Sequence, residues 1–454
     1  MKLTDLNRHG GIGSNCLHLQ IEDMSIVVDC GFHPKKIGLD SVPEVDVLHD
    51  HTVDLVILTH CHLDHLGALP LLLRRQPQAE VLCSLPTQTL APRMLHNSCN
   101  VMQKQKEEHR IPELPLYTHQ EIDHIEHQFT PMKFGHSRYF SSKAGNTEVE
   151  ITIFPAGHIV GAVGVQIVHK RRKIFLTGDV LFAAQETING AKFPEGPFDT
   201  LVIETTHGAK EREAPANRSQ ELARLVDTIE HTHAHGGSTL IPVFALGRMQ
   251  ELLAVFHKMH KQHGRLKDIP IFCAGLGMDL AGMFDQIAKK TGLINFTKKI
   301  LKELDIRKLP TNLTPGKAPG EQGLYLVSSG MLVERTPSYK VLASLLHEHS
   351  NTICFVGYCD PDTPGGELQA TAAGDPFLFE AFDYACPARA RIERFELSGH
   401  AERDELIDFA IKCSPRAIVL SHGDPDAREW FETELAIHGF GNVINPKPLT
   451  SILV

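Results

Sequence analysis

The sequence has few aromatic residues, no long apolar run and no excess of positive charge. Aromatic residues make up 6% of the 454 residues, so platforms on which nucleic-acid bases could stack are not obvious. The longest apolar stretch, residues 66–73, contains a proline and is far too short to span a bilayer. Residues 1–15 lack the apolar core of a secretory signal peptide. We therefore expect no association with a membrane.

The cysteines and the charge balance narrow the class of protein further. The ten cysteines are scattered and form no C-x-x-C pair, which favours a reducing cytoplasm. The net charge of −10 and the pI of about 6.3 argue against a generally basic nucleic-acid binder, because phosphate affinity normally comes from lysine and arginine. A bound metal cluster can supply positive charge locally, so a phosphodiester substrate stays open.

One short string, THCHLDH, carries most of the functional information. It places His60, His62, Asp64 and His65 directly after the apolar run 53–59, which predicts a buried strand. Extended backbone would send His60, His62 and Asp64 to a similar side, and a turn at Asp64 and His65 would bring the last imidazole round. These groups could then converge on more than one divalent ion. The alternative is a polar loop in a chain that has 28 histidines.

The hydrophobic pattern predicts α/β architecture in more than one part. Short apolar strands at 17–21, 25–28, 149–154 and 164–169 indicate a first part rich in hairpins, with the basic residues 170–173 at an exposed hairpin tip. From about residue 212 the pattern changes to clearer helices, 217–233 and 247–263, around a buried strand at 238–243. Prolines and glycines in 308–322 predict a loop, and the end of the chain returns to strand, helix and strand.

Polar residues also stand where several other predicted strands end. Any one of them could be a turn cap, but together with THCHLDH they indicate an active site, because loops at the carboxyl ends of strands gather such sites in α/β proteins. The residues are Asp29, His158, Asp179, Glu204, His400 and His422.

The order of these motifs resembles the β-CASP nucleases of the metallo-β-lactamase fold, which include RNase J and the endonuclease of mRNA cleavage and polyadenylation. THCHLDH alone supports only the broad superfamily, whereas IPVFALGRMQELL, LSGHA and SHG narrow the resemblance to β-CASP. The resemblance implies an αββα sandwich with an inserted α/β β-CASP domain. The expected boundaries are 1–205 and 391–454 for the metallo-β-lactamase domain and 206–390 for the insert.

The family also implies a ligand set for two zinc ions, for which manganese could substitute. One ion would be held by His60, His62 and His158, and the other by Asp64, His65 and His422, with Asp179 as the bridge. A hydroxide between the ions would attack a phosphodiester and leave 5′-phosphate and 3′-hydroxyl ends.

Further residues take supporting roles by the same resemblance. Asp29 would fix the tautomer of a ligand histidine, Glu204 would orient a histidine, and His400 would protonate the leaving 3′ oxygen. A histidine with an ordinary pKa of about 6.5 can give up that proton at neutral pH. The expected catalytic residues are His400, Glu204, Asp64 and Asp179.

The resemblance points to single-stranded RNA as the substrate. A histidine at the position of His422 accompanies RNA-cleaving members, and the β-CASP insert caps the metal site to form a cleft for a single strand. In that insert Ser328, Ser329, Gly330 and Arg248 could bind phosphate, although a simple serine-glycine turn explains the first three equally well. Endonuclease and 5′ exonuclease action both remain open.

Two departures from the family pattern leave the identity of the substrate open, but they do not affect the expected metal ligands. Glu204 is followed by Thr-Thr-His-Gly where many members have Ser-Thr-Tyr-Gly, and the segment after Gly357 is more acidic than usual. The chain also ends about thirty residues after His422 and resembles the compact core of the family. We therefore expect a homodimer or an RNA-processing partner protein, or RNA structure, to direct the choice of substrate.

Two other functions remain as alternatives. One is a hydrolase of a small thioester or lactam, which uses the same metal chemistry but usually lacks the insert and the pair His400 and His422. The other is a non-catalytic RNA-binding paralogue. That alternative is weakened because every expected ligand is present.

Overall fold

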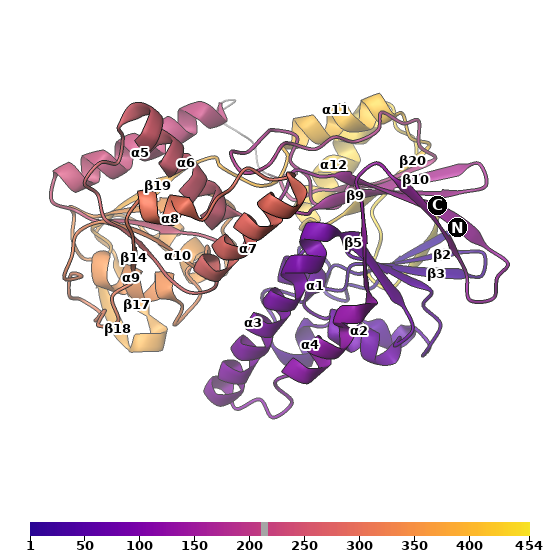
Figure 1. The fold of residues 1–454 in the computed structure, drawn as a ribbon, viewed down its shortest axis with the longest axis horizontal. Coiled ribbons are helices and arrows are strands. Elements are labelled where there is room, and N and C mark those ends of the chain that lie inside the picture. The colour runs from indigo at the N-terminus through magenta and orange to yellow at the C-terminus, as the bar shows by residue number, and fades with distance from the viewer. Residues whose placement is uncertain (210–216) are drawn as a thin grey trace. The chain divides into compact units, whose positions relative to one another are not determined.

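The structure is a computed structural model that describes residues 1–209 and 217–454. The expected change of pattern near residue 212 lies outside the described residues. The chain divides into two compact units, whose helices and strands are labelled in Figure 1. Unit 1 comprises Met1–Ala184, Asn189–Glu211 and His400–Val454, and unit 2 comprises Gln185–Ile188 and Arg212–Gly399.

Unit 1 contains two seven-stranded sheets. In the first sheet, β3 to β6 run parallel and the outer strands β1, β2 and β22 pair antiparallel. Alternate residues of β2 are buried, as expected for a strand with one face on the core. The strand order is β22 (Ser451–Leu453), β1 (Lys2–Asp5), β2 (Leu17–Ile21), β3 (Met24–Val28), β4 (Leu55–Ile57), β5 (Glu80–Ser84) and β6 (Phe129–Met132).

The second sheet of unit 1 begins with hairpins and ends with parallel strands. Strands β9 and β10 pair antiparallel, and Lys170 and Arg171 form the turn between them, which confirms the predicted hairpin tip. Strands β10, β11 and β20 run parallel. The order is β21 (Val443–Ile444), β20 (Ala417–Ser421), β11 (Thr200–Glu204), β10 (Arg172–Leu176), β9 (Val163–His169), β8 (Glu148–Pro155) and β7 (Ser137–Ser141).

The two sheets share one apolar core, and helices cover their outer faces. Ile26 of the first sheet and Ile151 of the second belong to the same buried cluster. Residues of α11 (Arg403–Cys413) and α12 (Pro425–Ile437) pack with the outer side of the second sheet in another cluster, and Figure 1 shows these helices beside β20 and β10. Helix α3 (Leu85–His109) contacts β5 and β6. This αββα arrangement confirms the predicted fold of the metallo-β-lactamase part.

The remaining helical segments of unit 1 are short. Helix α4 begins with a capping box in which Thr118 and Glu121 satisfy each other's backbone N–H groups. The helices are α1 (Leu63–Leu66), α2 (Leu69–Arg75) and α4 (His119–Ile125), and the 3₁₀ turns are η1 (Gly38–Ser41), η2 (Val45–Val47) and η3 (Glu126–Gln128).

Unit 2 is built on a parallel six-stranded sheet. Its central strands β12, β15 and β16 are buried at every residue, which explains their continuous apolar sequences, since helices cover both faces of such a sheet. The order is β14 (Ile306–Lys308), β13 (Ile271–Cys273), β15 (Leu324–Val327), β12 (Thr239–Pro242), β16 (Thr352–Phe355) and β19 (Arg391–Arg394).

The helices of unit 2 include both that the sequence predicts. They are α5 (Arg218–Ala234), α6 (Arg248–His263), α7 (Leu276–Thr291), α8 (Lys299–Glu303), α9 (Pro337–Leu345) and α10 (Pro364–Ala370). A two-stranded hairpin, β17 (Pro376–Phe379) and β18 (Tyr384–Pro387), flanks the turn η4 (Glu380–Phe382). This inserted α/β unit confirms the second part of the predicted fold.

A short segment from the first part of the chain belongs to unit 2. The carboxylate of Glu251, 1% exposed, accepts hydrogen bonds from the backbone N–H groups of Glu186 and Thr187 at 2.7 and 2.9 Å. The Thr187 hydroxyl adds a third bond at 2.8 Å. These bonds hold Gln185–Ile188 in unit 2. None of the helices in the described residues is both long and apolar enough to cross a bilayer.

We expect the core between the sheets to dominate the stability of unit 1. Ile151 is fully buried there, so Ile151→Ala should lower the free energy of unfolding by about 2–5 kcal/mol, and Ile151→Val by about 0.5–1.5 kcal/mol. Ile437→Ala, at a side chain 71% exposed, is the control and should change it by less than about 0.5 kcal/mol. Urea unfolding of the three variants checks this, and equal effects at both positions would contradict it.

Candidate metal centre

The carboxyl ends of strands from both sheets of unit 1 deliver the predicted site residues to one place. Asp29 follows β3 and His60 lies beyond β4 in the first sheet. In the second sheet His158 follows β8, Asp179 follows β10, Glu204 ends β11 and His422 follows β20. Strands β8, β10, β11 and β20 all point the same way, because β9 is antiparallel to both of its neighbours. The sequence-distant strand ends therefore share one edge.

The local structure of THCHLDH differs from the expected extended loop. Strand β4 ends at Ile57, and His62 is the extended N-cap of α1, so Asp64 and His65 project from one helical turn. Backbone bonds fix this turn, because Cys30 N–H donates to the carbonyl of His65 at 2.7 Å. A side chain at Gly31 would collide with the backbone of Asp64, since an added Cβ would lie 1.6 Å from its carbonyl oxygen. The helical turn, not strand alternation, brings the ligands together.

The side chains form overlapping groups whose potential ligand atoms lie within 4.8 Å of one another. One group contains His60, His62 and His158, and another contains Asp64, His65 and His422. Asp179 lies between them. Its Oδ2 is 3.7 Å from His60 Nε2 and from His158 Nε2, and 3.3 Å from His65 Nε2. Its Oδ1 is 3.5 Å from His422 Nδ1.

The cluster has the chemistry of a metal site. His60, His65, His158, Asp179 and His422 are all buried. Within the described residues, His60 Nε2 and Asp179 Oδ1 are buried and make no hydrogen bond. Such atoms are rare in folded proteins, because an unsatisfied buried polar group is costly. Imidazole nitrogens and carboxylate oxygens are ligands that suit zinc, and manganese can use a similar set. The residues present therefore fit divalent metal ions.

Burial and mutual charge set the protonation of these groups. Burial, reinforced by the neighbouring His65, lowers the pKa of His60 well below its ordinary value. Burial would by itself raise the pKa of Asp179, but His422 and His65 hold that pKa well below its usual range. His60 is thus neutral and Asp179 ionised, which are the forms that bind a metal. The pKa of His65 shifts the other way. Burial would lower this pKa, but the nearby carboxylates outweigh burial and raise it, with Asp179 the strongest of them.

His400 and Glu204 form a second, connected pair. His400 Nδ1 lies 2.9 Å from Glu204 Oε2, and Glu204 Oε1 also accepts the backbone N–H of Val180 at 2.6 Å. The backbone N–H of Ala401 donates to the carbonyl of Val180 at 2.6 Å, which ties the His400 loop to the end of β10. His400 therefore sits in a loop before α11 and not directly at the end of a strand, as the sequence had suggested.

The pKa of His400 is not the ordinary value that the sequence analysis expected. Burial acts to lower it, but the adjacent Glu204 carboxylate outweighs burial and raises the pKa of His400 to about 9. The imidazole ring of His158 lies 4.4 Å from that of His400, centroid to centroid, so this pair borders the metal-type cluster. At neutral pH His400 is therefore protonated.

Three further residues of the site were missed by sequence reasoning. The amide nitrogen of Asn15 lies 2.9 Å from His65 Nε2. Thr59 donates to Asp29 at 2.7 Å, and Thr206 donates to Glu204 at 2.6 Å. Thr59 directly precedes His60 and Thr206 follows Glu204 by two residues, so their positions beside motif residues were a usable signal. Asn15, in a glycine-rich stretch, offered none.

The predicted phosphate-binding residues all lie in unit 2. Ser328, Ser329 and Gly330 follow β15, and Arg248 is the first residue of α6. Ser329 accepts the backbone N–H of Val333 at 3.0 Å, as in a local turn. Nη1 of Arg248 is buried and has no hydrogen-bond partner in the described residues. Burial, with Arg218 nearby, lowers the pKa of Arg248 to about 9.

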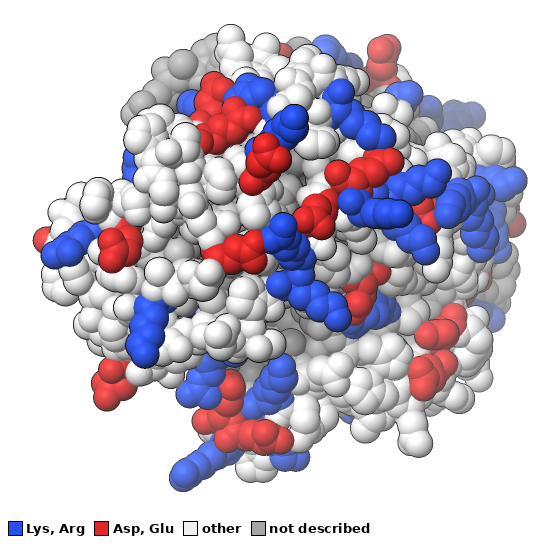
Figure 2. Space-filling model, turned by 60° about the vertical axis from the view of Figure 1, so that its left-hand side comes forward, with Lys and Arg blue, Asp and Glu red and all other residues white. Residues whose placement is uncertain are grey.

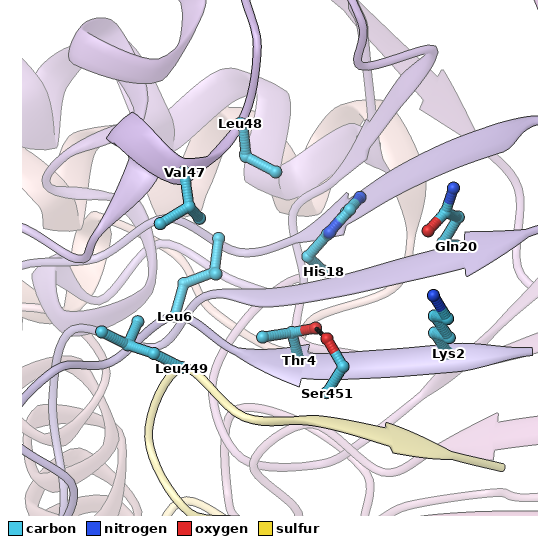
Figure 3. A pocket seen from close by; sticks show the side chains of 9 residues that line it. All are labelled: Lys2, Thr4, Leu6, His18, Gln20, Val47, Leu48, Leu449 and Ser451. Atoms are coloured by element: carbon cyan, nitrogen blue, oxygen red, sulfur yellow. Dashed lines mark hydrogen bonds between the residues drawn. The ribbon is translucent and has the colours of Figure 1, made fainter.

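One separate cavity of unit 1 lacks the cluster of histidines and carboxylates that marks this site. Figure 2 shows lysine and arginine interspersed with aspartate and glutamate over most of the face drawn. A cavity of about 240 Å³ in unit 1 is floored by strands β1, β2 and β22, and Figure 3 shows the side chains that line it. Three of its polar side chains bond within the protein: Thr4 with Ser451 at 2.8 Å, and His18 with Ser25 at 2.9 Å.

Comparison with protein-family models divides the chain into three matched regions. Residues 18–206 match the metallo-beta-lactamase superfamily domain, and residues 219–368 match the Beta-Casp domain. Residues 386–446 match a domain described as the Zn-dependent metallo-hydrolase RNA specificity domain. The first and third matches contain all of the predicted ligand residues.

Several characterised proteins are similar along nearly the whole chain. An RNase J-like protein of Methanocaldococcus jannaschii is 27% identical over 432 residues, which cover 92% of each chain. The transcription termination factor FttA of the same organism and the endoribonuclease YSH1 of Saccharomyces cerevisiae are each 26% identical. The matches cover 91% and 93% of this chain, but only 65% of FttA and 54% of YSH1.

A solved structure shares the fold. The crystal structure of a protein of unknown function from Enterococcus faecalis V583 aligns with a TM-score of 0.54 and 14% identity. The alignment covers 100% of this chain and 99% of the other. At this identity the likeness concerns the fold alone.

We expect Glu204→Gln to lower the pKa of His400 in chelator-treated protein from about 9, because burial is then opposed only by the carboxylates of Asp179 and Asp64. Because the folded protein holds this proton more tightly than the unfolded chain does, the protonated His400 stabilises the fold. This contribution is fully present below pH about 6.5 and is lost as the pH rises through about 9. NMR titration of the histidines checks the pKa. A midpoint that does not move would contradict the assigned role of Glu204.

Proposed function

This chain belongs to the β-CASP family of metallo-β-lactamase-fold hydrolases, and we propose that it is a zinc-dependent ribonuclease acting on single-stranded RNA. The observation that carries the proposal is Asp179, a buried and ionised carboxylate with one unpartnered oxygen between two groups of potential ligands. The products would be 5′-phosphate and 3′-hydroxyl ends.

The two groups of side chains divide the ligands between two ions. We assign His60, His62 and His158 to one ion, Asp64, His65 and His422 to the other, and Asp179 to both. Manganese could replace zinc, since the same donor atoms suit it. When bound, such ions polarise the phosphoryl oxygens and lower the pKa of a water that can attack the phosphorus.

The residues of the protein supply the remaining steps. Asp64 and Asp179 place negative charge beside the imidazoles that hold the ions. Glu204 accepts a hydrogen bond from His400 Nδ1 and so leaves Nε2 as the atom that carries the transferable proton. His400 then donates this proton to the leaving 3′ oxygen. A pKa of about 9 keeps the donor charged before the reaction.

The choice of RNA rests on the relatives and on one matched domain. The RNase J-like protein and the endoribonuclease YSH1 are similar across more than nine-tenths of this chain. His400 and His422 both lie within the region that matches the RNA specificity domain. We assign Ser328, Ser329, Gly330 and Arg248 to binding of RNA phosphates, for which the unpartnered guanidinium nitrogen of Arg248 is the main support.

The domain assignment and the cellular setting follow the same proposal. We propose residues 1–205 and 391–454 as the catalytic domain and 206–390 as the β-CASP domain. All ten cysteines are free thiols, which supports the cytoplasm as the site of action. A homodimer or an RNA-processing partner protein would direct substrate choice.

A small-molecule hydrolase is the main alternative with the same metal chemistry. The presence of the β-CASP match and of the pair Glu204 and His400 favours the nuclease. Turnover of a generic thioester, measured beside cleavage of labelled RNA, separates the two functions. Thioester turnover without RNA cleavage would support the alternative. RNA binding without cleavage by the metal-loaded protein would support a non-catalytic role.

Loss of one ligand should abolish the activity. We expect His60→Ala and Asp179→Ala to reduce the single-turnover rate of RNA cleavage by a factor of about 10³ or more, because each removes a group that would hold the ions. His136→Ala is the control and should keep the wild-type rate, because this histidine is exposed and its Nδ1–H donates to the carbonyl of Phe134 at 3.0 Å. Full activity of either ligand variant would refute the two-metal proposal.

Loss of the proton donor should leave the metals in place. We expect His400→Ala to slow single-turnover cleavage by about 10²–10⁴-fold, the usual contribution of a general acid, while elemental analysis finds the metal content of the wild type. The defect should be smaller for an RNA whose leaving oxygen is replaced by sulfur, which needs no protonation. A loss of metal that parallels the loss of rate would instead make His400 a ligand.

A further inference from the structure

Thr206 joins the proton donor to one histidine of the metal-type cluster. Its Oγ1 lies 2.6 Å from Glu204 Oε2 and 2.9 Å from His422 Nδ1. The loop that carries Thr206 is packed closely on the loop of His422, because an added Cβ at Gly423 would lie 2.1 Å from the Thr205 hydroxyl. The backbone N–H of Thr205 also donates to the carbonyl of His422 at 3.2 Å. The position of Thr206 is therefore well fixed.

The direction of these hydrogen bonds follows from counting protons. An ionised carboxylate only accepts, so the single hydroxyl proton of Thr206 is donated to Glu204. Toward His422 the hydroxyl oxygen can then only accept. The other neighbour of His422 Nδ1, Asp179 Oδ1 at 3.5 Å, is an acceptor as well. His422 Nδ1 therefore carries a proton, and Nε2, which lies 3.3 Å from Asp64 Oδ2, is the nitrogen left to bind a metal ion.

Thr59 repeats this arrangement on the other sheet of unit 1. Its Oγ1 and its backbone N–H both donate to the carboxylate of Asp29 at 2.7 Å. The same hydroxyl oxygen lies 3.1 Å from His60 Nδ1 and can only accept from it. The proton of His60 is thus on Nδ1, and the atom left with a lone pair is Nε2, which is the buried nitrogen without a hydrogen-bond partner in the described residues.

We propose that Thr59 and Thr206 are positioning residues, each of which links a buried carboxylate to one ligand histidine and holds that histidine with its Nε2 lone pair toward the ions. The inference rests on the metal site of the proposed function. Asp29 acts through Thr59 on His60, and directly on His65 through a bond of 2.7 Å. Glu204 acts through Thr206 on His422 and directly on His400. Each carboxylate thus orients two histidines.

The test replaces each hydroxyl by a methyl group and measures zinc binding without RNA. Thr59→Val and Thr206→Val keep the branched shape but remove the proton and the acceptor, whereas Thr59→Ser and Thr206→Ser keep the hydroxyl. Thr232→Val is the matched control, because it removes a buried threonine hydroxyl of unit 2 that bonds to the hydroxyl of Thr352 at 2.8 Å and not to a carboxylate or a histidine in the described residues. Zinc affinity is measured by competition with a chelating dye, and the Co²⁺ absorption spectrum reports the ligand geometry.

We expect each valine variant to bind one of its two zinc ions about 10–100-fold more weakly, as is typical when the partner of a ligand histidine is lost. The Co²⁺ spectrum should change with it. The serine variants and Thr232→Val should resemble the wild type. Valine variants that bind zinc as the wild type does would overturn this inference but not the proposed function. Serine variants that bind zinc as weakly as the valine variants would do the same. A wild-type protein that binds no zinc would overturn the proposed function.

Discussion

The burial of ionised carboxylates among histidines is the constraint on which the rest of this structure depends. A buried charge without partners costs several kcal/mol, so Asp29, Asp179 and Glu204 must each be compensated where they stand. Threonine hydroxyls, backbone N–H groups and imidazoles compensate Asp29 and Glu204 within the protein. Asp179 keeps one oxygen without a hydrogen bond in the described residues. Asp29 and Glu204 thus support the neighbouring side chains, whereas Asp179 keeps an oxygen that could bind a metal ion.

The packing of the two sheets of unit 1 brings the carboxylates and their partners together. Their shared apolar core fixes the register of both, and the parallel strands end along one edge. Side chains far apart in sequence, such as Asp64 and His422, thereby come within 3.3 Å. A slip of one residue in any of these strands would turn its end residue to the other face of the sheet. The strand register that buries the apolar core is therefore also the register that brings the candidate ligands together.

Much of this arrangement could be predicted from sequence, because it depends on patterns that are local. Short apolar strands that end in polar residues, and the spacing of THCHLDH, indicated an active site at one edge of the sheets, and the family resemblance supplied the candidate ligands. The αββα fold with its insert followed from the family resemblance and is confirmed. Helix α3 was missed, although its buried residues recur at helical spacing, since it contains Pro92 and polar residues interrupt its apolar ones. A turn at Asp64 and His65 was expected, but its helical form was not, because a contact with the distant Cys30 stabilises it.

Other features could not be read from one sequence at all. The raised pKa of His400 depends on the distance to Glu204. The role of Thr59 depends on its contacts with the neighbouring His60 and with Asp29, 30 residues away in the sequence. The role of Thr206 depends on its contacts with the nearby Glu204 and with His422, 216 residues away. Hydroxyl residues are common in loops, so their number says nothing about such contacts. Only the geometry distinguishes a threonine that orients a ligand from one that caps a turn.

The central claim is that the buried cluster around Asp179 binds two metal ions. Anomalous X-ray diffraction at the zinc edge, from crystals of the zinc-loaded protein, tests it most directly. The account predicts two peaks in each chain, one among His60, His62 and His158, and one among Asp64, His65 and His422, with Asp179 contacting both. A single peak, or no peak within the cluster, would contradict it.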